Sequence, residues 1–184
     1  MTGDPNEGLF TDGGCSGNPG PGGWGCIVET DGTCHEYSGG RARTTNNQME
    51  LQALIEGLRN APGEGKLRIV TDSEYLAKGV TQWMKGWIKN GWKTASKQPV
   101  KNQEFWREIN LLLLGREYSF EWVKGHSGHE ENERCDELAR TADLNPPELS
   151  VRTTRIRSRS GTPAGRASMS SCARSLWAAT SVAR

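Results

Sequence analysis

The chain has 184 residues, of which 34% are hydrophobic and 24% charged, so it can form one folded domain, alone or followed by a tail. No apolar run approaches the roughly 18 residues that cross a bilayer, and the first residues lack the basic and apolar segments of a signal peptide, which argues against a membrane or secreted protein and favours the cytoplasm. The last 39 residues contain seven arginines and one acid, so residues 1–145 carry 16 basic and 21 acidic side chains, a net charge of −5, and any nucleic-acid contact needs a local basic patch.

The first part of the chain is predicted to form three antiparallel strands. Residues 9–11 are strand-like and end at Asp12. Residues 13–23 are so rich in glycine and proline that a loop is predicted there. Residues 24–29 and 33–37 flank an Asp-Gly pair, which is a strong hairpin signal.

A helix and a buried strand are predicted next. Thr45 or Asn46 can cap the helix, and Pro62 follows its end. Residues 67–71 form an apolar strand that runs into Asp72. The helix is indicated by apolar residues at i, i+3, i+4 and i+7, namely Leu51, Leu54, Ile55 and Leu58.

The rest of the folded part is predicted to be helical except for one strand. Residues 118–123 form that strand, and a helix follows at about 131–143. A meander followed by alternating helix and strand indicates a mixed sheet covered by helices. We expect a domain over 8–145 and an Arg/Ser-rich, disordered tail over 146–184. Residues 74–114 are expected to form three short helical stretches, broken at Gly86, Gly91 and Pro99.

The cysteines indicate reduced thiols. They are odd in number, and no two form a C-x-x-C pair, which argues against a disulfide framework and against a zinc site. Reduced thiols are typical of the cytoplasm. The five are Cys15, Cys26, Cys34, Cys135 and Cys172.

Four acidic residues stand out by their positions. Asp12 and Asp72 each end a strand, Glu50 lies in the first turns of a helix, and Asp136 lies on the last helix. Acids at the edge of an apolar stripe are unfavourable unless something neutralises them. Magnesium, a hard cation bound by carboxylates and phosphate oxygens, can do so, and two such ions about 3.5–4 Å apart can drive phosphodiester hydrolysis. Taken singly, each acid is more typical of a turn, a cap or a solvated helix face than of a catalytic site.

The surroundings of these acids resemble a known family. The chain is similar to the type 1 ribonucleases H, particularly the cellular bacterial ones, over about residues 8–145. The resemblance is carried by six segments in order, Phe10-Thr11-Asp12-Gly13, Gly17-Asn18-Pro19-Gly20-Pro21-Gly22-Gly23, Thr44-Thr45-Asn46-Asn47-Gln48-Met49-Glu50, Thr71-Asp72-Ser73, Val123-Lys124-Gly125-His126-Ser127-Gly128-His129 and Asn132-Glu133-Arg134-Cys135-Asp136-Glu137-Leu138-Ala139.

This resemblance implies both a fold and an activity. The fold would be α/β and ribonuclease H-like, a five-stranded mixed sheet, three antiparallel strands then two parallel, flanked by helices. The activity would be that of a monomeric endonuclease that hydrolyses the RNA strand of RNA–DNA hybrids with two Mg²⁺ ions, which Mn²⁺ could replace, leaving 5′-phosphates. The implied metal ligands and catalytic carboxylates are Asp12, Glu50, Asp72 and Asp136. His126 would be a catalytic loop histidine that assists proton transfer or product release, since imidazole titrates near working pH and glycines allow its loop to move.

A basic and aromatic stretch is a candidate for gripping the substrate. Between residues 78 and 101, six lysines are interleaved with tryptophans, and this stretch contains no acidic residue. This pattern predicts a local positive patch with flat aromatic faces. The alternative is a solvated lysine face over core tryptophans. The stretch resembles the family's basic protrusion, with Trp83 and Thr94 as matched contacts. The lysines are Lys78, Lys85, Lys89, Lys93, Lys97 and Lys101.

Short polar side chains are candidates for reading the substrate. The RNA 2′-hydroxyl is both donor and acceptor, which suits recognition by amides. By resemblance, a phosphate of the DNA strand would bind Arg43, Thr45 and Asn102. The minor-groove contacts would be Asn18, Asn46 and Asn47, together with the Cys15 backbone and Asn132.

Two other functional classes remain to be distinguished. A catalytically silent hybrid-binding module would gain nothing from clustered acids facing phosphates. A resolvase-like or transposase-like nuclease of the same fold would lack the lysine–tryptophan stretch and the asparagines. A P-loop is rejected because the glycine-rich segment lacks its Gly-Lys-(Ser/Thr) ending. The tail could add phosphate affinity, bind a partner or be idle.

Overall fold

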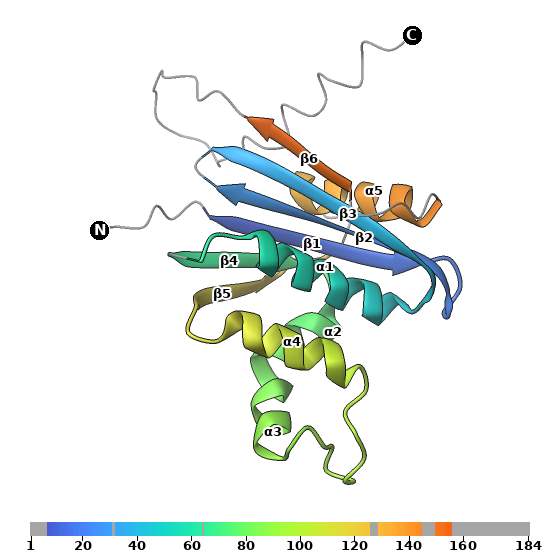
Figure 1. Ribbon diagram of the computed structural model, residues 1–184, viewed down its shortest axis with the longest axis vertical. Coiled ribbons are helices and arrows are strands. Elements are labelled where there is room, and N and C mark those ends of the chain that lie inside the picture. Colours follow the sequence, from blue (N-terminus) through green and yellow to red (C-terminus); the bar gives the residue numbers. More distant parts are fainter. Residues whose placement is uncertain (1–6, 31, 64, 126–128, 145–149, 156–184) are drawn as a thin grey trace.

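The computed structural model describes residues 7–30, 32–63, 65–125, 129–144 and 150–155, and these form one mixed sheet covered by helices (Figure 1). The strand order is β5-β4-β1-β2-β3-β6. Strands β1, β2 and β3 form an antiparallel meander, whereas β1 pairs with β4, and β4 with β5, in parallel. The strands are β1 Gly8–Cys15, β2 Gly20–Thr30, β3 Thr33–Thr44, β4 Lys66–Thr71, β5 Glu117–Trp122 and β6 Ser150–Arg155. The predicted arrangement of three antiparallel and two parallel strands is confirmed.

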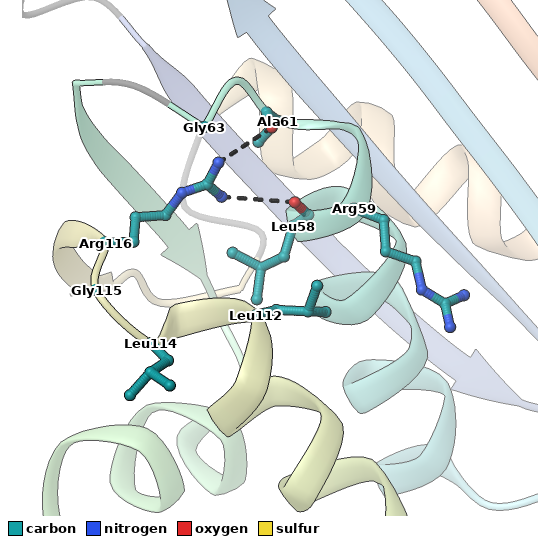
Figure 2. Close-up of a pocket in the computed structure, with 8 residues that line it drawn as sticks. All are labelled: Leu58, Arg59, Ala61, Gly63, Leu112, Leu114, Gly115 and Arg116. Carbon is teal, nitrogen blue, oxygen red and sulfur yellow. Dashed lines mark hydrogen bonds between the residues drawn. The ribbon is translucent and has the colours of Figure 1, made fainter.

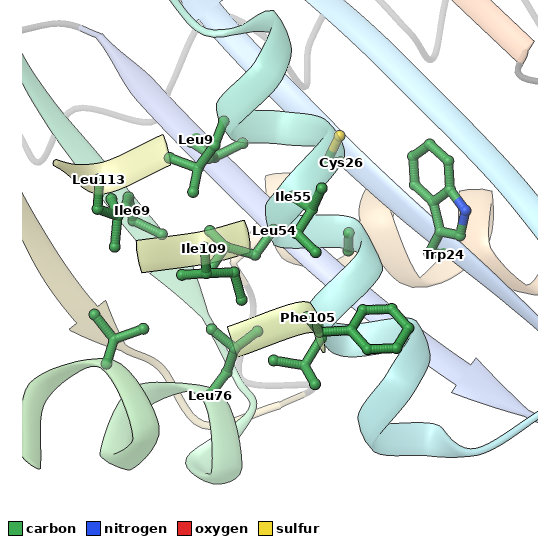
Figure 3. Packing of buried hydrophobic residues seen from close by; sticks show 14 of the residues in the cluster. Leu9, Trp24, Cys26, Leu54, Ile55, Ile69, Leu76, Phe105, Ile109 and Leu113 are labelled. Atoms are coloured by element: carbon green, nitrogen blue, oxygen red, sulfur yellow. The ribbon is translucent and has the colours of Figure 1, made fainter. Parts of the chain in front are cut away.

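Helices cover both faces of the sheet. Helix α1 (Asn46–Asn60), α2 (Glu74–Lys78) and α4 (Gln103–Leu113) contribute to one apolar cluster, in which Leu51, Leu54 and Leu58 are buried as their period predicted. Figure 3 shows this packing, with Ile55 of α1 near Ile109 and Phe105 of α4. Helix α5 (Glu130–Leu144) covers the opposite face, where Cys135 packs with Phe10, Ile27 and Val70.

The glycine-rich segment after Asp12 is not a loop, so that prediction is wrong. Strand β1 continues to Cys15 and β2 begins at Gly20, with Gly14 paired to Gly23 and Cys15 to Gly22. Only residues 16–19 lie between the two strands. Backbone pairing needs no side chain, so glycine weakens a strand without preventing it. The consequence is a long hairpin that extends beyond Asp12.

The helical stretch after β4 also differs from the prediction. Helix α2, the π-helix η1 (Gly79–Trp83) and helix α3 (Met84–Lys89) follow one another without a break, so Gly86 does not end a helix. A single exposed glycine costs a helix only about 1 kcal/mol, which neighbouring contacts offset. The breaks predicted at Gly91 and Pro99 are confirmed, because no helix is assigned between α3 and α4.

Part of the segment expected to be disordered forms a strand. Strand β6 pairs antiparallel with β3, from Thr33 opposite Arg155 to Ser38 opposite Ser150. The edge backbone of β3 offers unpaired donors and acceptors, which an extended segment of any composition can satisfy. Residues 145–149 and 156–184 lie outside the described residues, so the domain boundary at residue 145 stays a prediction.

Three of the cysteines are reduced and form no disulfide, as predicted. These are Cys15, Cys26 and Cys135. The prediction is wrong for Cys34, which is disulfide-bonded, while Cys172 lies outside the described residues. Within the part of the chain that the structure describes, no helix has the length and apolar character needed to span a bilayer.

Candidate functional site

Three carboxylates meet at one end of the central strands. The parallel pairing of β1 with β4 ends at Thr11 opposite Thr71, so the next residues, Asp12 and Asp72, emerge side by side. Glu50 joins them from α1. One ligand oxygen from each of the three acids lies within 4.8 Å of the other two. This acidic cluster, Asp12, Glu50 and Asp72, brings together three of the four acids predicted from the sequence.

Helix α1 is held so that Glu50 reaches this cluster. A capping box fixes its first turn, in which the Gln48 nitrogen donates to Thr45 Oγ1 at 3.4 Å and the Thr45 nitrogen donates to Gln48 Oε1 at 3.2 Å. The helix backbone also rests directly on β1. A β-carbon on Gly13 would lie 2.4 Å from the carbonyl carbon of Met49, so only glycine permits this approach.

The fourth acid, Asp136, comes from the opposite face of the sheet. Gly25 pairs with Asp12 in the β1–β2 ladder, and a β-carbon on Gly25 would lie 2.6 Å from the Cys135 carbonyl oxygen. Helix α5 therefore packs against the sheet at Gly25, the residue paired with Asp12. The charge of Asp136 raises the pKa of Asp12, so Asp136 borders the cluster, but its Oδ2 is paired with Arg140 Nη2 at 2.7 Å.

The cluster is electrostatically unfavourable without a cation. Burial, followed by the charge of Asp72, raises the pKa of Asp12 to about 7, against the lowering effect of the Gly13 N–H, which donates to Asp12 Oδ1 at 2.7 Å. Burial and the charges of Asp12 and Asp72 raise the pKa of Glu50 well above its usual value, against a hydrogen bond from Ser73. Oxygen Oε2 of Glu50 is buried without a hydrogen-bond partner among the described residues.

These features fit a hard divalent cation. Carboxylate oxygens are the ligands that Mg²⁺ and Mn²⁺ prefer. A buried acceptor without a donor, in the middle of three acids, is the kind of group that a cation satisfies. A mixed sheet with such a centre at the end of its strands is typical of metal-dependent phosphodiester hydrolases.

Three of the predicted substrate contacts lie beside one another at the β1–β2 hairpin. The Cys15 nitrogen donates to Asn46 Oδ1 at 2.9 Å, and Cys15 Sγ lies 3.0 Å from the same oxygen. Asn18 Oδ1 is 4.0 Å from Cys15 Sγ. The side chains of Asn18 and Asn46 are exposed. The hairpin tip and the start of α1 thus form one polar surface.

The other predicted polar contacts occupy the starts of helices. Arg43 is exposed at the end of β3, and Thr45 and Asn47 are half-buried at the start of α1. Asn102 precedes α4 in a left-handed conformation and donates to the Tyr75 hydroxyl at 3.4 Å. Asn132, on α5, is only 4% exposed, and its buried Oδ1 lacks a partner within the described parts of the chain.

The lysine–tryptophan stretch forms an exposed helical excursion. Lys85, Lys89 and Trp83 are exposed on η1 and α3, while Thr94 is half-buried in the following turn. Some tryptophans of this stretch are exposed enough to contact a substrate, and others pack against the core. Trp83 packs 6.0 Å from Tyr75 and is 36% exposed, whereas Trp87 and Trp92 are half-buried and pack against the apolar cluster.

Two contributors to the site escaped the sequence analysis. Ser73 begins α2, accepts from the Leu76 nitrogen at 3.3 Å and also hydrogen-bonds to Glu50. Arg140 pairs with Asp136 one helical turn away, and this i, i+4 spacing is visible in the sequence. The predicted His126 lies outside the described residues.

A separate groove of about 450 Å³ lies at the other end of α1 (Figure 2). Arg116 donates there to the Ala61 carbonyl at 3.1 Å and to the Leu58 carbonyl at 3.5 Å. Arg116 therefore caps the end of α1, and the groove contains none of the predicted site residues.

Comparison with known proteins identifies the family to which the chain belongs. The sequence model of the RNase H family matches residues 4–143. Ribonuclease H of Hydrogenovibrio crunogenus is 54% identical over 73% of this chain and 92% of its own length, and that of Escherichia coli is 51% identical over 75% and 89%. The chain belongs to the ribonuclease H family, of the bacterial type 1 form, and is an endoribonuclease that cleaves the RNA strand of RNA–DNA hybrids.

Solved structures show the same fold. LC9-RNase H1, described as a type 1 RNase H with the type 2 active-site motif, has a TM-score of 0.67 and 31% identity over 78% of this chain and 75% of its own. LC11-RNase H1, solved in complex with an RNA/DNA hybrid, has a TM-score of 0.57 and 27% identity over 74% of this chain and 96% of its own.

Proposed function

We propose that the reaction takes place at the acidic cluster, with Asp12, Glu50, Asp72 and Asp136 holding Mg²⁺ and with Mn²⁺ able to replace it. The observation that carries this proposal is the approach of three carboxylates within 4.8 Å around a buried Glu50 oxygen that lacks a donor in the described structure. When bound, two divalent cations supply the positive charge that activates water and stabilises the leaving oxygen.

The chain's own residues have separate parts in this reaction. The four acids would hold the cations, and Ser73 holds Glu50 in place by a hydrogen bond. Water adds to phosphorus and the bond to the 3′ oxygen breaks, which leaves a 5′-phosphate and a 3′-hydroxyl. By its position in the family motif, His126 would transfer a proton or assist product release.

The substrate would lie across the hairpin tip and the helical excursion. Asn18, Asn46, Asn47 and Asn132, with the Cys15 backbone, would read the minor groove and the 2′-hydroxyls of the RNA strand. On the DNA strand, Arg43, Thr45 and Asn102 would bind a phosphate, and Trp83, Lys85, Lys89 and Thr94 would grip the backbone. The hybrid complex of LC11-RNase H1 supports this substrate. We further propose that the protein acts as a cytoplasmic monomer.

A cleavage assay with three substrates tests this function. The full chain is incubated with end-labelled RNA–DNA hybrid, duplex DNA and duplex RNA, each with Mg²⁺ and with EDTA. The expected result is cleavage of the RNA strand of the hybrid alone, in Mg²⁺ alone, with 5′-phosphate ends. Binding without cleavage would indicate a hybrid-binding module, and cleavage of duplex DNA would indicate a nuclease of another kind on this fold.

A further inference from the structure

Asp136 differs from the three clustered acids in having a cation of its own. Its Oδ2 lies 2.7 Å from Arg140 Nη2, one turn later on α5. Asp12, Glu50 and Asp72 have no such ion pair among the salt bridges of the described residues. The guanidinium is also near enough to Asp12 for its charge to lower the pKa of that carboxyl.

Arg140 is not needed to hold α5 on the sheet. That contact is supplied six residues earlier, where Arg134 donates through Nε and Nη2 to the buried Glu36 at 3.0 and 3.2 Å. The Arg140 side chain is 73% exposed, and an exposed ion pair at i, i+4 stabilises a helix only slightly. Its effect on stability is therefore small, whereas its charge lies beside the acids.

We propose that Arg140 is a positioning residue that neutralises Asp136 while the site lacks a divalent cation and competes with that cation for the Asp136 carboxylate. The inference rests on the proposed cation site. A divalent ion that binds the Asp136 carboxylate would compete for the oxygen that the guanidinium holds at 2.7 Å, so the ion binds fully only when the arginine gives way. Because the side chain is long and mostly exposed, it can turn into solvent when the cation binds.

The inference predicts tighter cation binding when the arginine charge is removed. Titration calorimetry with Mn²⁺ on the full chain, at pH 8 and low salt, should give for Arg140→Gln a Kd about fivefold lower than wild type. Arg140→Lys should stay within about twofold of wild type, since the charge remains. A control is Arg59→Gln, which removes a charge on the far part of α1 that is paired with Glu56 at i, i+3 and with Glu108 of α4 and should leave Kd unchanged.

A double-mutant cycle tests whether the effect passes through Asp136. In an Asp136→Asn background, Arg140→Gln should change Kd by less than about twofold. A second readout is the rise in thermal unfolding midpoint that Mn²⁺ produces, which should be larger for Arg140→Gln than for wild type. A merely structural arginine would shift the midpoint equally with and without Mn²⁺.

The outcomes separate this inference from the proposed function. Mn²⁺ binding by wild type with an unchanged or weaker Kd for Arg140→Gln would overturn the role of Arg140 alone. So would a fivefold effect that persists in the Asp136→Asn background. Absence of any Mn²⁺ binding by wild type would overturn both the inference and the cation site on which it rests.

Discussion

The backbone of Glu50 lies directly over Gly13, so closely that a β-carbon on Gly13 would sit 2.6 Å from the Glu50 nitrogen. Gly13 follows Asp12 in β1, and its N–H donates to the Asp12 carboxylate. The same glycine therefore sets the separation of strand and helix and orients one of the acids. The position of Glu50 depends on a missing side chain as much as on the helix that carries it.

We predict that Gly13→Ala destabilises the fold and weakens cation binding. The methyl group must push α1 away from β1, and such overpacking typically costs about 1–3 kcal/mol. Gly14→Ala is the matched control, because a β-carbon there meets no atom within 4 Å and should change the free energy of unfolding by less than about 0.5 kcal/mol. Urea unfolding and Mn²⁺ titration measure both effects; equal behaviour of the two variants would contradict the role of Gly13.

Replacing Asp12 should stabilise the cation-free protein at alkaline pH. The pKa of Asp12 is raised to about 7 from an ordinary 3.8, so between these values the unfolded chain loses a proton that the folded chain keeps. Stability is therefore lost as the pH rises from about 4 to about 7 and then levels off. Asp12→Asn removes this penalty, which is at most about 4 kcal/mol because one pKa unit corresponds to about 1.4 kcal/mol.

The measurement is urea unfolding of both proteins in EDTA at pH 4 and pH 8. The stability difference should be near zero at pH 4 and favour Asp12→Asn at pH 8. The variant should bind hybrid and fail to cleave it. Equal stability at pH 8 would contradict the raised pKa of Asp12, and cleavage at the wild-type rate would contradict its part in the reaction.

Cation binding should itself depend on pH. A bound cation requires the ionised carboxylate, so at pH 6 its binding must release the proton held by Asp12. The affinity for Mn²⁺ should rise between pH 6 and about pH 7 and change little above pH 8. Calorimetry in two buffers of different ionisation enthalpy measures the released protons, and the same affinity and no proton release at pH 6 would contradict the raised pKa of Asp12.

The buried ion pair between α5 and β3 should be costly to break on one side. Glu36 is 1% exposed and accepts two hydrogen bonds from Arg134. Arg134→Met leaves a buried unpaired carboxylate and should cost about 3–5 kcal/mol. The double variant Glu36→Met with Arg134→Met should recover most of this loss. Denaturant unfolding checks both variants, and a single variant as stable as the double one would show that the pair contributes little.

Truncation should separate strand β6 from the segment that follows it. Deleting 147–184 should leave cleavage intact at low salt, because the acidic cluster is carried by β1, α1 and the end of β4. That deletion also removes β6 and uncovers the edge of β3, so it should unfold at a lower temperature than a chain ending at residue 155. A 147–184 deletion that is still folded at the assay temperature but inactive would show that the tail takes part in catalysis.

Local patterns in the sequence predicted most of the elements correctly. The spacing of Leu51, Leu54 and Leu58 determined one face of α1, because a helix repeats every 3.6 residues whatever it packs against. Glycine content misled the prediction after Asp12, because strand pairing there depends on a partner strand that local composition does not reveal. Strand β6 was missed for the same reason.

The sequence by itself determined that the four acids lie at the ends of strands and in helices, and it predicted that they carry the chemistry. Only the tertiary structure decided how they meet, since Gly13 and Gly25 set the approach of α1 and α5 through contacts with residues 36 and 110 positions away. It also decided that Asp136 is paired with Arg140 while the other three acids cluster. The pKa of Asp12 is set by its burial and by its distance from other charges, and both arise from long-range packing.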